Sequence, residues 1–237
     1  MLAFHAAHPG VTARGFARGT SYEFLAAQIS HDARVLDLAC GNGPLLALCG
    51  ENVVGIDLSL PELLGTERTA VARAQQLPFA NASFDVVACH LAFMLFDDIE
   101  QVVAELGRVL IPGGELVAIM GGGPTAEGRD AFHRFLELSG NRTIPPLGDP
   151  RAKSERGWAD LFTDWTIDPW QRHPIDLSGS FEDVWTFLAS AYEADPGLRD
   201  QLRAEFPTDP VPCTAVTYVA RARSPRTRSA PSTSSRP

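Results

Sequence analysis

The stretch Val35 to Gly43, Val-Leu-Asp-Leu-Ala-Cys-Gly-Asn-Gly, decides the fold of this chain. An apolar run that contains Asp37 passes through small residues and two glycines into Pro44, which is the order of a buried strand, a tight turn and a helix. Gly41 and Gly43 leave the turn without Cβ atoms, so a ligand can approach its backbone closely. The stretch therefore predicts a ligand site at the carboxyl end of a strand in an open α/β sheet.

Strand and helix patterns alternate on both sides of this stretch. The expected strands cover residues 35–38, 52–56, 70–74, 84–89, 115–120, 165–177 and 214–222. The expected helices cover residues 22–29, 61–68, 97–110, 126–138, 154–162, 181–192 and 196–206, with a short helix after Gly43 and a turn at 112–114. This order predicts a Rossmann-like, doubly wound sheet with helices on both faces, mostly parallel, whose last strand is antiparallel.

The chain is expected to form one domain over residues 1–222. Within it, residues 1–30 form an N-terminal lid or helix, and residues 122–195, where the strand-helix rhythm changes, form the side that receives a substrate. Residues 223–237 consist of Ser, Pro, Thr, Arg and Ala, a composition that predicts a disordered tail.

Composition narrows the class of protein. The 237 residues are 45% apolar, and 20 basic against 29 acidic residues give a net charge of −9, which argues against a nucleic-acid partner. No leader pattern and no apolar run long enough to span a membrane are evident, so we expect a cytoplasmic protein, monomeric or homodimeric, with no membrane partner. The cysteines lack metal-ligand spacing, so no metal site is expected. They are Cys40, Cys49, Cys89 and Cys213.

The spacing of acids and glycines selects among nucleotide-like ligands. A dinucleotide fingerprint needs a third glycine where this chain has Leu46. The second acid, Asp57, follows Gly43 by fourteen residues, sooner than in the nicotinamide pattern. The pattern instead suits a ligand that has a cationic amino-acid end and a ribose but no pyrophosphate.

Five motifs in order over residues 34–120 resemble the class I S-adenosylmethionine-dependent methyltransferase family. They read Val-Leu-Asp-Leu-Ala-Cys-Gly-Asn-Gly, Val-Gly-Ile-Asp-Leu-Ser, Leu-Pro-Phe, Ser-Phe-Asp-Val-Val and Glu-Leu-Gly-Arg-Val-Leu-Ile-Pro-Gly-Gly. The resemblance implies S-adenosyl-L-methionine as cofactor, S-adenosyl-L-homocysteine as product and methyl transfer to a small molecule.

The resemblance also implies roles for single residues. The methionine and ribose part of the cofactor would be lined by Asp37, Ala39, Gly41 and Gly43. Asp57 would accept hydrogen bonds from the ribose hydroxyls, Leu58 would pack on the adenine, and Tyr22 would cover the cofactor or belong to the core.

One position departs from the family pattern. Arg73 stands where relatives commonly have an acid that contacts the adenine amino group, and a guanidinium cannot accept a hydrogen bond. Adenine recognition is then expected to move to the Ala74 backbone and Gln75.

A histidine and a group of aromatic residues are the candidates for contact with the methyl acceptor. His90 follows the strand at 84–89 and is the candidate general base, the alternative being a histidine that bonds to cofactor or backbone without proton transfer. All four tryptophans fall in residues 122–195 with many other aromatic rings, of which two or three are expected to line an apolar acceptor pocket. The acceptor would be an aromatic or apolar metabolite with an oxygen, nitrogen or carbon nucleophile.

Two other functions stay open at this point. A nicotinamide oxidoreductase would use a similar sheet, although the missing third glycine counts against it. A cofactor-binding protein without transfer activity is the second alternative, because Arg73 departs from the family pattern.

Overall fold

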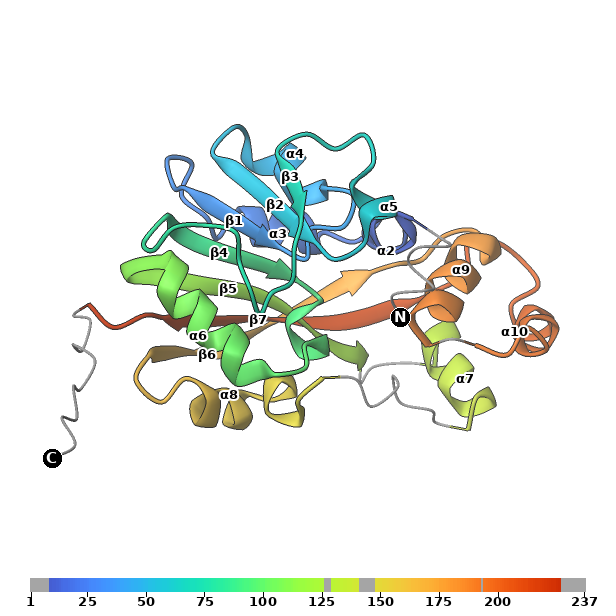
Figure 1. Ribbon diagram of the computed structural model, residues 1–237. Coiled ribbons are helices and arrows are strands. Elements are labelled where there is room, and N and C mark those ends of the chain that lie inside the picture. Colours follow the sequence, from blue (N-terminus) through green and yellow to red (C-terminus); the bar gives the residue numbers. More distant parts are fainter. Residues whose placement is uncertain (1–8, 126–128, 141–147, 193, 227–237) are drawn as a thin grey trace, which may run out of the picture.

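The computed structural model describes residues 9–125, 129–140, 148–192 and 194–226. These residues form one seven-stranded sheet with helices packed around it (Figure 1). Its strands in chain order are β1 Val35–Leu38, β2 Val53–Asp57, β3 Thr69–Val71, β4 Phe84–His90, β5 Leu110–Pro124, β6 Thr166–Asp176 and β7 Thr214–Arg223. Their order across the sheet is β3-β2-β1-β4-β5-β7-β6. Strands β1 to β5 pair in parallel, and β7 pairs antiparallel with both β5 and β6. The predicted fold class is thereby confirmed.

The parallel register brings the ends of the first strands together. Asp37 near the end of β1 lies opposite Gly55 of β2 on one side and Ala88 of β4 on the other. The carboxyl ends of β1, β2 and β4 therefore open at one edge of the sheet, where open α/β sheets bind ligands.

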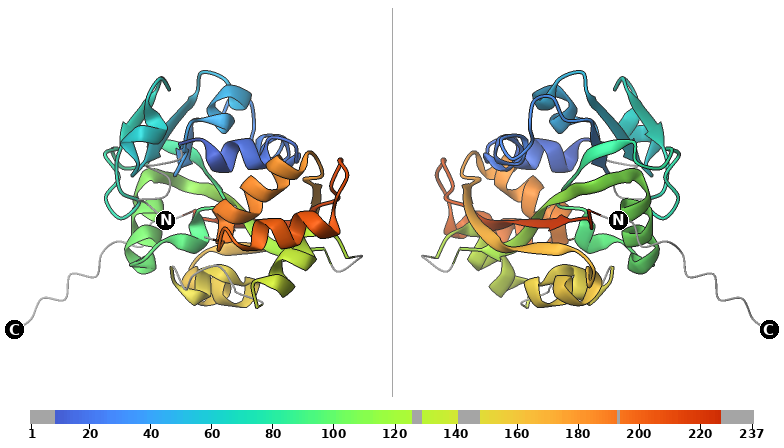
Figure 2. Two further views of the ribbon diagram at one scale, coloured as in Figure 1. Left: turned by 90° about the vertical axis from the view of Figure 1, so that its right-hand side faces the viewer. Right: turned by 90° about the vertical axis from the view of Figure 1, so that its left-hand side faces the viewer.

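The sheet is covered on both faces. One face packs α6 Ile99–Val109 and α8 Glu155–Leu161, and the other packs α3 Ser21–Ala26 and α4 Pro44–Cys49 (Figures 1 and 2). Leu36 of β1 belongs to the first of these cores, and Val35 to the second. Because successive side chains point to opposite faces and both faces are buried, β1 reads as an unbroken apolar run apart from Asp37.

A third core lies beyond the carboxyl ends of the strands. It is built from α7 Ala131–Leu138, α9 Phe181–Tyr192 and α10 Leu198–Glu205, and α2 Val11–Phe16 packs on α9 (Figure 1). A Cβ at Gly15 of α2 would lie 3.0 Å from Cδ2 of the Phe187 ring of α9, so glycine lets the two helices approach closely without displacing this ring. These helices roof the edge at which the site opens.

The last strand is inserted inside the sheet, between β5 and the edge strand β6. Arg221 of β7 reaches the carboxylates on both neighbours, at 3.1 Å to Glu115 of β5 and 3.9 Å to Asp168 of β6. Arg223 lies in β7 and pairs with Glu115 at 3.5 Å, so the strand includes the first residue of the predicted tail. Residues 227–237 of that tail lie outside the described residues.

Element bounds differ from the predictions where proline and glycine intervene. The helix expected at 61–68 is only α5 Leu60–Leu63, because the chain turns at Gly65 with φ 84°. The turn expected at 112–114 is part of β5, where Gly113 at φ 82° accompanies a shift in register against β4. The helix expected from residue 126 begins at Ala131, where the Asp130 side chain caps it, and residues 126–128 lie outside the described range.

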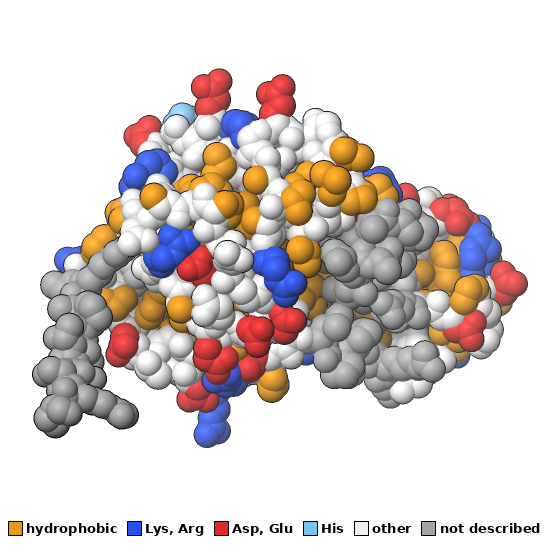
Figure 3. Space-filling model, viewed as in Figure 1, with side chains coloured by type: hydrophobic (Ala, Val, Ile, Leu, Met, Phe, Trp, Pro, Cys, Tyr) orange, Lys and Arg blue, Asp and Glu red, His pale blue; other side chains and the backbone are white. Residues whose placement is uncertain are grey.

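Within the described residues, no helix is long and apolar enough to cross a membrane. Apolar side chains nevertheless gather on the surface over β3 and α5 (Figure 3). The large apolar residues exposed there are Leu58, Leu60, Leu64 and Val71.

Candidate functional site

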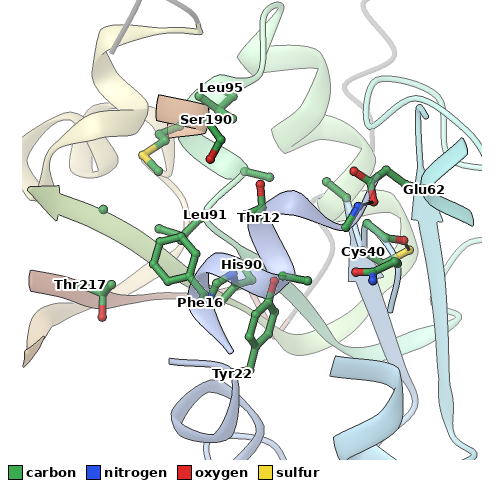
Figure 4. A pocket seen from close by; sticks show the side chains of 18 of the residues that line it. Thr12, Phe16, Tyr22, Cys40, Glu62, His90, Leu91, Leu95, Ser190 and Thr217 are labelled. Carbon is green, nitrogen blue, oxygen red and sulfur yellow. Dashed lines mark hydrogen bonds between the residues drawn. The ribbon is translucent and has the colours of Figure 1, made fainter. Parts of the chain in front are cut away.

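A cavity of about 420 Å³ lies at the carboxyl edge of the sheet, under α2, α7 and α9 (Figure 4). The strand ends and following loops contribute Asp37, Ala39, Gly41, Asp57, Leu58, His90, Leu91 and Gly121. The helices around it contribute Phe16, Tyr22, Glu62, Phe132, Phe187, Ser190 and Tyr192. Glu62 and Cys40 lie at one end of it and Thr217 at the other, with Phe16, Tyr22 and His90 between them (Figure 4).

The turn after β1 is held against β2 by Asp57. Its carboxylate accepts hydrogen bonds from the Gly41 N–H at 2.9 Å and the Ser59 N–H at 2.8 Å. Gly41 adopts a left-handed φ of 52°, which glycine tolerates, and Ala39 adopts a φ of 61°, which is unfavourable for a residue with a Cβ. The backbone of the turn is thereby fixed along one wall of the cavity.

Asp37 is the buried acid of the site. Its side chain is 2% exposed, and burial, together with the negative charge of Asp57, raises its pKa to about 8. A positive charge in the cavity near Asp37 would favour the ionised carboxylate and lower this pKa.

Glu62 is a third carboxylate of the site, and sequence reasoning missed it. It reaches from α5 to the cavity, is buried, and accepts a 2.7 Å hydrogen bond from the Gly10 N–H at the start of α2. A glutamate in a short helix has no distinctive spacing, and its partner is 52 residues away, so no local pattern points to it.

His90 lies at the centre of the cavity wall. Its Nε2 and the Ser21 Oγ are 2.9 Å apart and share a hydrogen bond, and the Tyr22 ring stacks on the imidazole at a centroid distance of 3.7 Å. Nδ1 is buried without a hydrogen-bond partner among the described residues. Burial lowers the pKa of His90 to about 3, so the ring is neutral at physiological pH.

Burial also governs the ionisation of Tyr22. It raises the pKa of this phenol above its ordinary value, with Asp37 and Glu62 adding to the effect. Tyr22 therefore remains a hydrogen-bond donor between the carboxylates and His90.

Three aromatic rings from the segment 122–195 line the cavity, in line with the two or three that we expected. They are Phe132, Phe187 and Tyr192. None of the four tryptophans, all within the described residues, lines it. Trp158 of α8, Trp170 of β6 and Trp165 between these elements pack in the first core, and Trp185 packs on Phe135.

Three residues that the resemblance assigned to the cofactor lie away from the cavity lining. Gly43 is at the start of α4, where a Cβ would come within 2.7 Å of Thr66. Ala74 is buried in the core. The Gln75 amide donates to the Asp97 carbonyl at 2.8 Å and to the Asp97 carboxylate at 2.7 Å, so its donors face away from the cavity.

Comparison with known proteins gives one family match and many relatives. Residues 36–118 match the family model described as "Methyltransferase domain". A demethylmenaquinone methyltransferase of Thermus thermophilus is 36% identical over 130 residues, 48% of this chain and 58% of the relative. The enzyme of the same name from Deinococcus radiodurans is 33% identical over 151 residues, 57% and 60% of the two chains. The chain thus spans somewhat over half the length of these relatives.

Solved structures share the fold. The YcgJ protein of Bacillus subtilis superimposes with a TM-score of 0.59 at 18% identity, over 87% of this chain and 99% of that one.

The chain is thus an α/β protein with a cavity at the carboxyl ends of its parallel strands, where open α/β sheets bind ligands. Residues 36–118, which are similar to a methyltransferase domain, contain the glycine turn and the strands β2, β3 and β4. The family match ends at residue 118, so the cavity residues from Gly121 onward lie outside it.

Proposed function

We propose that this protein transfers the methyl group of S-adenosyl-L-methionine to a small-molecule acceptor. One observation carries the proposal: three carboxylates, Asp37, Asp57 and Glu62, surround the glycine turn on one side of a cavity whose other side is apolar. A cofactor with an ammonium and a sulfonium group would match the first side, and an apolar acceptor would match the second.

The residues present fit this cofactor. Its ammonium and sulfonium are cations, and a cation beside Asp37 and Asp57 would offset the burial of Asp37 and the charge of Asp57, which together raise the Asp37 pKa. The open turn from Ala39 to Gly41 would hold the methionine end, and Asp57 the ribose hydroxyls. Leu58, 45% exposed at the cavity, would pack on the adenine, and Tyr22 would cover the cofactor.

Ser59 is an additional group at the same place. Its side chain is 4% exposed and lines the cavity, and its hydroxyl has no hydrogen-bond partner in the described part of the chain. Because a buried hydroxyl without a partner costs free energy, a ligand hydroxyl beside Ser59 would be stabilised.

When bound, the cofactor would supply a methyl group on a sulfonium: the acceptor's nucleophile would bond to the methyl carbon as the carbon–sulfur bond breaks in line, S-adenosylhomocysteine would leave, and the acceptor's proton would pass to solvent. The protein has to align the acceptor with that methyl group and to keep water away. The rings of Phe16, Tyr22 and Phe187 line the cavity and would exclude water from it. The acceptor loses a proton during or after the transfer.

The environment of His90 favours a hydrogen-bonding role over proton abstraction. A general base works best with a pKa near the working pH, whereas burial lowers the pKa of His90 to about 3. We therefore propose that His90 positions the acceptor as a neutral imidazole, and that a base role requires the acceptor to raise its pKa.

Calorimetry with S-adenosylhomocysteine tests the cofactor. Asp57→Asn keeps an oxygen that can accept from the turn but removes the charge, and we expect affinity to fall on the order of tenfold. Asp32→Ala is the matched control because its side chain is fully exposed, 100%, and distant from the cavity lining. Absence of binding to the unaltered protein would rule out the proposed cofactor.

Transfer of labelled methyl groups separates the proposal from its alternatives. A cofactor-binding protein without transfer activity would bind S-adenosylhomocysteine yet label no acceptor, and a nicotinamide oxidoreductase would bind NADH instead. The relatives from Thermus and Deinococcus are named demethylmenaquinone methyltransferases, so demethylmenaquinone belongs in the acceptor panel beside simpler phenols.

A further inference from the structure

The cavity is divided by charge. The only Asp or Glu side chains in its described lining are Asp37, Asp57 and Glu62, all at the glycine-turn end. Beyond Tyr22 and His90 the described lining contains no Asp, Glu, Lys or Arg (Figure 4). We call that second part the acceptor compartment; its lining includes Leu91, Met94, Gly121, Phe132, Phe187 and Tyr192.

The polar groups of the acceptor compartment are neutral hydroxyls. Ser190 donates its proton to the Phe187 carbonyl at 2.9 Å, and Thr217 donates to the His173 carbonyl at 3.0 Å, so both oxygens remain available only as acceptors. Burial raises the pKa of Tyr192 to about 12, which keeps its phenol protonated and able to donate. The compartment therefore offers hydrogen bonds to an uncharged polar group.

Two glycines of β5, Gly121 and Gly123, expose their backbone to this compartment. An added Cβ at Gly121 would come within 3.4 Å of the Met94 methyl group and 3.6 Å of Leu91, and at Gly123 it would meet nothing within 4 Å. Gly121 has no left-handed φ, so its backbone does not require glycine. Its missing side chain instead leaves room beside Leu91 and Met94.

From these observations we propose that the acceptor is an uncharged, flat aromatic molecule that lies on the bare backbone at Gly121, and that Gly121 determines which acceptors fit. The inference rests on the proposed methyl transfer and assigns its substrate class.

The physical reason is the cost of burying a charge without a partner. A carboxylate or phosphate on the acceptor would leave water, meet no cationic side chain in the described lining, and lie in a cavity with three carboxylates. A flat ring, by contrast, packs between the glycine backbone and the rings of Phe132 and Phe187 without such a cost.

Three fluorescent probes of equal ring size test the proposal: 2-naphthol, 2-naphthoate and 2-naphthylmethylamine, which are neutral, anionic and cationic at neutral pH. Each is titrated into the full chain saturated with S-adenosylhomocysteine. We expect 2-naphthol to bind, and each charged probe to bind more weakly by on the order of tenfold or more.

Substitutions at position 121 test whether Gly121 determines which acceptors fit. In Gly121→Leu the side chain fills the space beside Met94, so 2-naphthol affinity should fall on the order of tenfold, and in Gly121→Ala by less. S-adenosylhomocysteine affinity should be unchanged in both variants, which also reports that they fold. Gly197→Leu, at an exposed position outside the cavity lining, is the matched control.

The outcomes are distinguishable. If S-adenosylhomocysteine does not bind the unaltered protein, the proposed function fails. If it binds, but 2-naphthoate binds as well as 2-naphthol, or no probe binds, or Gly121→Leu binds 2-naphthol normally, the acceptor assignment is overturned and the cofactor assignment is not.

Discussion

Ala39 holds a backbone conformation that is unfavourable for any residue with a Cβ. Its φ of 61° lies in the left-handed region, which costs an L-residue roughly 1–2 kcal/mol. Part of the relief in Ala39→Gly is offset by the greater freedom of glycine in the unfolded chain, so we expect a net stabilisation of about 0.5–1 kcal/mol in urea unfolding.

The matched control, Ala47→Gly, should change the free energy of unfolding in the opposite direction. Ala47 is exposed within α4, where glycine costs about 1 kcal/mol relative to alanine, so Ala47→Gly should destabilise the protein. If Ala39→Gly also lowers the free energy of unfolding, the left-handed conformation at residue 39 is not strained.

We expect the Asp37 carboxyl to release a proton when S-adenosylhomocysteine binds. Burial and Asp57 raise its pKa to about 8, so below that pH the carboxyl of the free protein is largely protonated. A bound ammonium lowers the pKa again, and S-adenosylhomocysteine should therefore displace close to one proton and bind more tightly as the pH rises from about 6 to 8. Calorimetry in buffers of different ionisation enthalpy measures this proton.

Asp37→Asn is the control for that proton, because an amide cannot release it. Equal heats in all buffers for the unaltered protein, or the same release from the asparagine variant, would contradict the assignment to Asp37.

Single site residues were predictable from sequence where a local motif carries them. Asp37, Gly41 and Asp57 follow from the order strand, turn, strand, and the structure brings them to one cavity. Glu62 and the Ser21 partner of His90 were not predictable, because their contacts join positions 52 and 69 residues apart with no shared period.

At the scale of elements, α2 is tied to both sides of the cavity. Its first turn is anchored by the hydrogen bond from Gly10 to Glu62, and its last turn packs on α9 through Gly15 and Phe187. Glu62→Ala removes the charged acceptor, a loss of about 1.5–3 kcal/mol for a hydrogen bond of this kind. Amide hydrogen exchange in α2 should then become faster by on the order of tenfold or more.

Glu67→Ala, at an exposed position near α5, should leave exchange in α2 unchanged. Unaltered exchange in Glu62→Ala would mean that packing on α9 alone holds α2.

Strands were easier to predict than helix ends. The strands buried on both faces appear as apolar runs, and β1, β2 and β4 lie within a residue of their predicted bounds. The Pro-Gly-Gly at 112–114 suggested a turn but lies within β5 as an irregularity. Leu110 pairs with Phe84 and Glu115 with Val86, so residues 111–114 bulge out of the pairing with β4.

At the scale of the whole molecule, the buried groups His90 and Asp37 make stability depend on pH in opposite directions. Burial lowers the pKa of His90 to about 3, below its ordinary value of 6.5, so the stability due to neutral His90 is complete above about pH 6.5 and is lost as the pH falls towards 3. Burial raises the pKa of Asp37 to about 8, so its contribution is complete below about pH 4 and is lost as the pH rises to 8.

His90→Gln should therefore flatten the acid limb of the stability curve, by up to about 1.4 kcal/mol per pH unit between pH 6.5 and 3. Chemical unfolding at several pH values measures the slope. His31→Gln, whose side chain is 96% exposed, is the control and should leave the slope unchanged. An unchanged slope in His90→Gln would show that His90 titrates normally.

The overall architecture was predictable because alternating patterns restrict the topology, and the antiparallel last strand was expected. The position of β7 inside the sheet was not, since both late strands have edge-like alternation. Ion pairs from Arg221 to Glu115 and Asp168 accompany the observed order, and such long-range pairs have no signature in a single sequence.

That order has a consequence for how the protein is made. Strand β7 is synthesised after β5 and β6 but lies between them, so a nascent chain must keep one edge of β5 unpaired until residues 214–223 have emerged. Unpaired edges are templates for association with other chains. Ribosome-bound chains that stop before β7 should therefore bind chaperones or aggregate. Pairing of β7 with β5 then covers the open edge and removes this tendency to associate.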